Sequence, residues 1–149
     1  MSEAVPQSLK AGHEALRATL KRAMKEPGRV GEAGRKLAAI LDGHFLREEK
    51  FVLPLLGLLP ALAKGQPGAP AGGVARLLDQ LRAEVGQMIE EHRQISQAVH
   101  ELAQAAEAEG KSEYVGFAEE LILHAHVEED VLYPAAVVAG EYLKKMRGA

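Results

Sequence analysis

The chain has 149 residues, and its 18 Lys and Arg against 21 Asp and Glu give a net charge of −3 with neutral histidines. A nucleic-acid-binding protein usually carries a basic excess, so this balance argues against that class, and the absence of cysteine excludes disulfides, iron–sulfur clusters, zinc fingers and thiol nucleophiles. No apolar run approaches the roughly 18 residues of a membrane span, and the N-terminus lacks the apolar core of a signal peptide, so we expect a cytoplasmic protein that binds neither nucleic acid nor membranes.

The composition favours helices, because Ala, Leu and Glu are abundant and runs of β-branched residues are few. The first helical pattern spans residues 9–24, where apolar residues and one histidine recur at steps of three and four. Pro27-Gly28 ends this pattern. A second pattern spans residues 37–55, and we expect Pro54 to kink or end that helix.

Residues 64–73 form the clearest loop of the chain, because Gly and Pro dominate them. A third helical pattern follows over residues 74–110. The fourth spans residues 114–131 and meets Pro134, and residues 135–146 are expected to form a short C-terminal helical segment.

Four amphipathic helices joined by short or flexible loops predict an all-α fold, an up-down-up-down four-helix bundle. The helices group into two hairpins, at about residues 8–62 and 74–135, which the 64–73 loop joins. Each hairpin is too small to enclose a core alone. We therefore expect residues 1–149 to form a single domain.

An internal repeat relates the two hairpins. Residues 44–54 align without gaps on residues 124–134, at an offset of 80, and the histidine, both glutamates and the proline are shared. His13 and His92 are 79 residues apart and occupy equivalent places on the first and third helices. Each half therefore contributes one histidine and one His-x-x-x-Glu pair.

The polar residues of this repeat lie on the apolar stripes of their helices. Side chains at i and i+4 share one helix face, about 6 Å apart along the axis, so they project together into the bundle. Two buried carboxylates would be costly or would take up protons unless cations compensate them. Imidazole and carboxylate without sulfur suit iron or manganese, with zinc as an alternative. We predict a dinuclear site with metals about 3.5–4 Å apart, bridged by the two glutamates and capped by the histidines: His13, His44, Glu48, His92, His124 and Glu128.

These motifs resemble the hemerythrin-like (HHE cation-binding) family over roughly residues 8–135. The matching residues are His13, His44-x-x-x-Glu48 with Leu53-Pro54, Glu91-His92, and His124-x-x-x-Glu128-Glu129 with Leu132-Tyr133-Pro134. The resemblance implies a hemerythrin-like bundle around two non-haem iron ions, bridged by an oxo or hydroxo group. It also implies that the centre handles O₂, peroxide or NO, or senses iron or oxygen.

The chain departs from the oxygen-carrying members of that family at two places. They have a His-x-x-x-His pair on the third helix, where this chain has Ser96 four residues after His92, and His-x-x-x-x-Asp on the fourth helix, where it has His124-x-x-x-Glu128. One capping histidine is missing, which disfavours simple reversible O₂ carriage. The open position would admit peroxide or water, or Tyr114 as an extra ligand, because Tyr114 lies on the same stripe as His124.

The remaining histidines and carboxylates are interpreted as surface residues or as residues that support the candidate ligands. His126 pairs with Asp130 at ligand spacing but lies on a mixed face, so we expect His126 and also His100 at the surface. We expect the glutamates that flank the ligand positions to lie at the surface or to fix a histidine tautomer; these are Glu49, Glu91 and Glu129. Neither the Glu-x-x-His pairs of ferritin-like proteins nor a zincin His-Glu-x-x-His occurs here.

Two classes of function remain. We favour handling of peroxide or oxygen, catalase-like or detoxifying, with small oxidants (O₂, H₂O₂ or NO) as partners. The alternative is a non-enzymatic sensor, carrier or store for O₂, NO or iron that uses the same di-iron site. A metal-free helical interaction module is a third reading, but six polar residues in one core would destabilise such a bundle. The sequence leaves the oligomeric state open.

Overall fold

The structure, a computed structural model, describes residues 5–66 and 73–146, so most of the predicted 64–73 loop lies outside the described residues. The elements in this part of the chain are all helical. None of these helices is both long enough and apolar enough to cross a membrane. Their order is α1 (Gln7–Met24), α2 (Gly28–Phe51), α3 (Leu53–Leu56), α4 (Leu59–Ala63), α5 (Val74–Ala108), α6 (Ser112–Val127), the π-turn η1 (Glu128–Leu132) and α7 (Tyr133–Met146).

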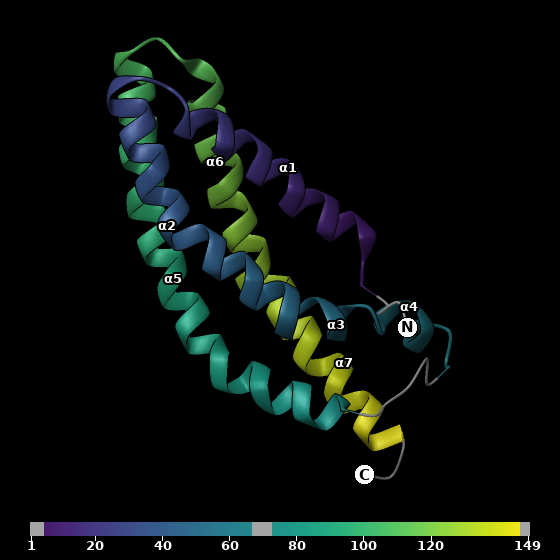
Figure 1. Ribbon diagram of the computed structural model, residues 1–149. Coiled ribbons are helices and arrows are strands. Elements are labelled where there is room, and N and C mark those ends of the chain that lie inside the picture. The colour runs from purple at the N-terminus through teal and green to yellow at the C-terminus, as the bar shows by residue number, and fades with distance from the viewer. Residues whose placement is uncertain (1–4, 67–72, 147–149) are drawn as a thin grey trace.

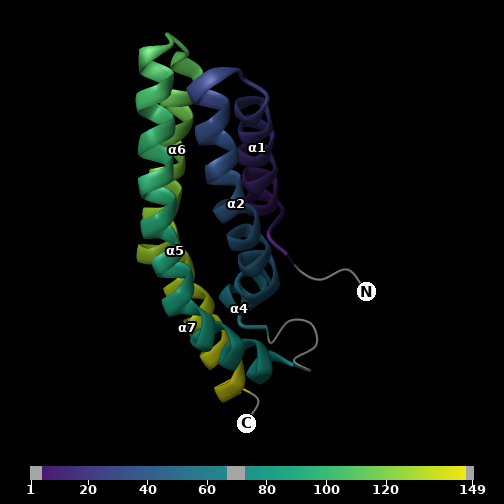
Figure 2. The same cartoon turned by 60° about the vertical axis from the view of Figure 1, so that its left-hand side comes forward.

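The long helices form an antiparallel bundle (Figures 1 and 2). α1 packs against α2 and α6, and α5 packs against the same two helices, so α2 and α6 occupy opposite corners. This arrangement confirms the predicted all-α, up-down-up-down four-helix bundle.

Two apolar clusters fill the bundle, one toward each end. The first contains Leu16, Phe45, Ile95 and Leu121 among others, and the second contains Phe51, Met88, Tyr133 and Leu143 among others. Along α1, α2 and α5, residues His13, Glu48 and His92 lie between the part that enters one cluster and the part that enters the other. His44 lies one turn before Glu48, and His124 and Glu128 lie between the α6 residues of the first cluster and Leu132 and Tyr133 of the second. The ligand residues therefore form one polar layer across an otherwise apolar interior.

The two prolines of the repeat act differently. α2 ends at Phe51, close to Pro54, as predicted. Pro134 does not end the fourth helix, because α6, η1 and α7 follow one another without an intervening loop. The expected C-terminal helical segment at residues 135–146 is confirmed as α7, which begins two residues earlier, at Tyr133, and continues the fourth helix. A π-turn carries one extra residue per turn, and it lies directly before the proline, where a regular helix would lose a hydrogen bond.

α7 closes the lower end of the bundle in Figure 1. It packs against α3 and α5 and buries Tyr133, Ala136, Gly140 and Leu143. A Cβ at Gly140 would lie 3.2 Å from Leu78 Cδ1, so glycine allows the close approach of α7 to α5. This packing brings Tyr133 to the edge of the polar layer.

Candidate metal centre

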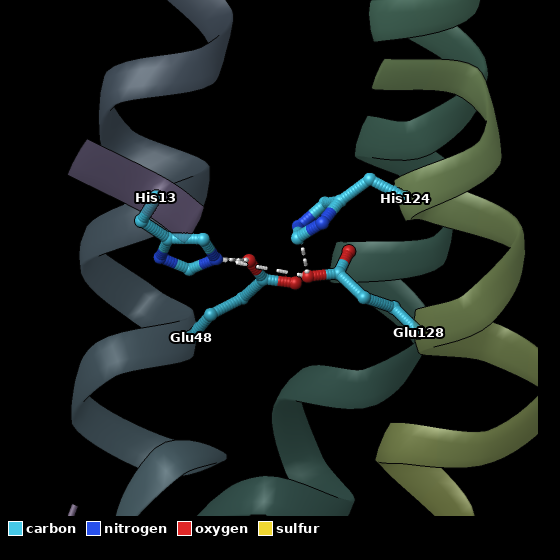
Figure 3. A group of neighbouring side chains, drawn as sticks. All are labelled: His13, Glu48, His124 and Glu128. Carbon is cyan, nitrogen blue, oxygen red and sulfur yellow. Dashed lines mark ion pairs between the residues drawn. The ribbon is translucent and has the colours of Figure 1, made fainter. Parts of the chain in front are cut away.

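The six predicted ligand residues converge in the middle of the bundle. They form two groups of four whose ligand atoms lie within 4.8 Å of one another. The first group is His13, Glu48, His124 and Glu128 (Figure 3), and the second group is His44, Glu48, His92 and Glu128. Both glutamates belong to both groups, whereas each histidine belongs to one.

Each glutamate directs one oxygen to each group. Glu48 Oε1 lies 3.2 Å from His13 Nε2, and Glu48 Oε2 lies 3.2 Å from His44 Nε2. Glu128 Oε2 lies 2.9 Å from His124 Nε2, and Glu128 Oε1 lies 2.9 Å from His92 Nε2. This is the arrangement that two bridging carboxylates would have between a pair of cations.

The donor atoms fit cations better than they fit one another. Glu48 Oε1 and His124 Nε2 are buried, and their short contacts with His13 and Glu128 lack the geometry of a hydrogen bond. In the second group, the Nε2 atoms of His44 and His92 face each other at 3.0 Å. Buried polar atoms are normally hydrogen-bonded, and a cation in each group would satisfy these lone pairs. Nitrogen and oxygen donors without sulfur suit iron, manganese or zinc.

In three of the four histidines, a carboxylate contacts Nδ1, the ring nitrogen that faces away from the donor groups. His13 Nδ1 lies 3.0 Å from Glu49, His44 Nδ1 lies 2.9 Å from Glu91, and His92 Nδ1 lies 2.5 Å from Glu129. Such a partner holds the proton on Nδ1 and leaves the Nε2 lone pair available to bind a metal ion. The structure thus places all three flanking glutamates against the rings, as the tautomer-fixing interpretation requires.

His124 differs from the other three histidines. Its Nδ1 has no carboxylate partner among the described residues, and its side chain is 22% exposed, against 1% for His44. In the repeat, Glu91 precedes His92 as Gly12 precedes His13. Glu91, which contacts His44, therefore has Gly12 as its counterpart, and a glycine offers no carboxylate to His124. The first group thus has one histidine without a carboxylate on Nδ1, and that histidine is the more exposed.

Tyr133 is a site residue that sequence reasoning missed. Its hydroxyl donates to Glu48 Oε2 and lies 3.3 Å from His92 Nε2 and 3.5 Å from Glu128 Oε1. The π-turn places Tyr133 on the inward face, five residues after Glu128. The repeat contained one signal, since the counterpart of Tyr133 in the first half is the apolar Leu53.

The hypothesis that Tyr114 is an extra ligand is wrong. Its hydroxyl donates to Glu26 at 2.9 Å, and Lys111 Nζ binds the same carboxylate. This cluster lies near the α1–α2 and α5–α6 connections, away from the ligand layer. His126 and His100 are exposed, which confirms their predicted surface positions.

The carboxylates of the site raise the pKa of the histidines that face them. Burial lowers the pKa of His13, but the nearby carboxylates of Glu128 and Glu48 outweigh burial and raise the pKa to about 9. The same balance raises the pKa of His44 to about 9. Burial would raise the pKa of Glu128, but contacts with the four histidines hold it well below its usual range. Protonated imidazoles therefore supply the positive charge that metal ions would otherwise bring.

A small cavity adjoins the ligand layer. Its volume is about 10 Å³, and it is lined by apolar residues and by His44, His92, His124 and Glu128. A groove of about 250 Å³ on the surface between α5 and α6 shares four residues with the cavity: His92, Ile95, Leu121 and Ala125. Ser96 lines that groove. The cavity has about the volume that one water molecule needs.

The model of one protein family, described as the hemerythrin HHE cation binding domain, matches residues 5–136. The match covers most of the chain, and the chain belongs to this family. No curated protein and no solved structure matches the chain significantly.

Proposed function

We propose that this member of the hemerythrin HHE family holds two iron ions in its ligand layer and uses them to handle peroxide or O₂. The observation that carries the proposal is the pair of donor groups that share Glu48 and Glu128. A site for one ion would need only one pair of histidines. Here each glutamate directs one oxygen to one pair of histidines and its other oxygen to the second pair. Manganese or zinc suits the same donors, and the experiment below distinguishes them.

One ion would be held by His13 and His124, the other by His44 and His92, and both by the two glutamates. The chemistry that a pair of iron ions supplies when bound is the exchange of two electrons with an O–O bond. The overall catalase-like reaction converts two H₂O₂ into one O₂ and two H₂O.

The protein itself contributes selection by size and control of protons. The cavity beside the histidines has room for a molecule of about the size of water, so it favours a small oxidant over any organic substrate. Ile95 and Leu121 line the cavity and keep its outer side apolar. Tyr133 keeps a proton on its hydroxyl beside Glu48, because burial and the neighbouring carboxylates raise its pKa well above the usual range.

The second candidate is a non-enzymatic sensor, carrier or store for O₂, NO or iron. One observation favours it. The polar side chains that line the cavity are three histidines and Glu128, all of them in the metal-binding groups. None of the residues lining the cavity is therefore free to act as a general acid or base, which a reversible binder does not need and a rapid catalyst usually does.

The test is anaerobic reconstitution with iron(II), and in parallel with manganese(II) and with zinc(II), followed by metal analysis, visible spectroscopy and measurement of O₂ release on adding H₂O₂. Two irons per chain with O₂ release support the enzymatic proposal. Two irons with a reversible O₂ or NO adduct and no turnover support the sensor or carrier. No retained metal, or exclusive retention of zinc, contradicts both.

Matched variants link the activity to the site. Glu48→Ala removes a carboxylate of both groups and should abolish iron retention and peroxide turnover. Glu90→Ala removes an exposed glutamate whose ion pair is with Arg93, and it should change neither. Full iron content and turnover in Glu48→Ala would refute the assignment.

A further inference from the structure

The continuous helix formed by α6, η1 and α7 carries an exposed apolar stripe on its outer face. Of the nine large hydrophobic side chains that are exposed among the described residues, six lie on this helix. The most exposed are Val138 at 64%, Leu123 at 63% and Val131 at 55%. Single exposed apolar residues are ordinary, but a contiguous set marks an interaction surface. We name these six residues together with the exposed Pro134 the α6–α7 stripe: Leu123, Val127, Val131, Pro134, Val138, Tyr142 and Met146.

The spacing keeps the stripe on one side of the helix. Its members follow one another at steps of four residues, with one step of three, and such steps place side chains along one face. Repeated steps of four drift around a regular helix, because one turn takes 3.6 residues. The wider π-turn over Glu128–Leu132 accommodates an extra residue and offsets this drift in the middle of the stripe.

The positions of the first six stripe residues are symmetric about a point between Leu132 and Tyr133. Leu123 and Tyr142 are equally far from this point, as are Val127 and Val138, and Val131 and Pro134. If two copies of the helix lay antiparallel about a twofold axis at this point, each of these residues would face its mirror member in the partner.

The charges at the ends of the stripe follow the same symmetry. Glu120 is exposed at the start of the stripe, and Lys145 is exposed at its end, at the same distance from the central point. In the antiparallel pair, Glu120 would face the partner's Lys145 at both ends, which is the charge complementarity that favours and orients association.

We propose that a second copy of this chain docks antiparallel along the α6–α7 stripe and forms a twofold-symmetric dimer. A copy of the same chain is the partner that presents the same residues in reverse order, as an isologous interface requires. The stripe spans about 35 Å of helix, and one helix is about 10 Å wide. Its footprint is smaller than the roughly 800 Å² per partner of a standard interface, so we expect a dimer that dissociates on dilution.

Sedimentation velocity of the full chain over a range of concentrations tests the proposal. The wild-type protein should shift from monomer to dimer as its concentration rises into the high micromolar range. Leu123→Glu should weaken dimerisation by about tenfold or more, because it places a charge in the apolar contact. Leu46→Glu is the matched control, since Leu46 is also 63% exposed but lies on α2, at the opposite corner of the bundle.

A charge exchange tests the orientation of the pair. Lys145→Glu places like charges at both ends and should weaken the dimer, and Glu120→Lys combined with Lys145→Glu should restore it. A wild-type protein that stays monomeric at all concentrations overturns the proposal, as does equal weakening by Leu46→Glu and Leu123→Glu. A double variant that is no stronger than Lys145→Glu alone overturns the antiparallel register. Circular dichroism of each variant verifies that the bundle is folded.

Discussion

The unequal support of the two metal groups predicts unequal affinities. Glu91 is buried and lies 2.9 Å from His44 Nδ1, and Arg47 contacts the same carboxylate. His124, in the other group, has no such partner among the described residues. A carboxylate behind a metal-binding imidazole makes the ring a better donor. The second group should therefore bind its ion more tightly than the first.

Glu91→Gln should lower the affinity of the second group by about tenfold, or about 1.4 kcal/mol. Loss of such a partner typically costs 10- to 100-fold, and we expect the lower end because the amide oxygen still accepts the Nδ1 proton of His44. Competition with a chromophoric chelator measures the affinities. In a His13→Ala background, only the second group keeps all four donors, so the measured constant is assigned without ambiguity.

Glu90→Gln is the control, because Glu90 is exposed and pairs with Arg93. It should leave both metal affinities unchanged. An unchanged affinity in Glu91→Gln, or an equal loss in Glu90→Gln, would refute the argument that the carboxylate acts through His44.

Three further outcomes follow from the site geometry. His44→Ala should lose one of two bound ions and Glu128→Ala both, because Glu128 belongs to both groups; equal losses in a metal analysis would rule out shared carboxylates. Tyr133→Phe should destabilise the metal-free protein by about 1–3 kcal/mol in urea denaturation, because a buried oxygen of Glu48 loses its donor; an unchanged free energy of unfolding would argue against that hydrogen bond. The folded-state pKa values of His13 and His44 are raised from 6.5 to about 9, so their contribution to metal-free stability is full below pH 6.5 and is lost as the pH rises through 9. Thermal unfolding of the metal-free protein measures this loss, and a melting temperature that rises over that range would contradict it.

Periodicity was sufficient to predict the bundle and to place the six candidate ligand residues in one layer of its interior. In a helix of 3.6 residues per turn, a histidine or glutamate on an apolar stripe must face the interior, and the repeat placed Glu48 and Glu128 at matching heights. The four histidines needed no further information, because each lies on such a stripe.

The same reasoning failed for the two tyrosines. Tyr114 shares a stripe with His124, but ten residues of helix separate them by about 15 Å along the axis, so a common face does not mean contact. Tyr133 lies five residues after Glu128, which is a different face of a regular helix. It reaches Glu48 because of the π-turn, and the hydrophobic pattern of a sequence does not reveal such a local change of helical period.

Native mass spectrometry during a metal titration shows whether the six side chains form one site for two ions. The wild-type chain should gain two ions, and the Glu48→Ala chain, which lacks a donor of both groups, should gain none at the same metal concentration. A wild-type chain that takes up no ion or only one, or a Glu48→Ala chain that still takes up two, would contradict such a site.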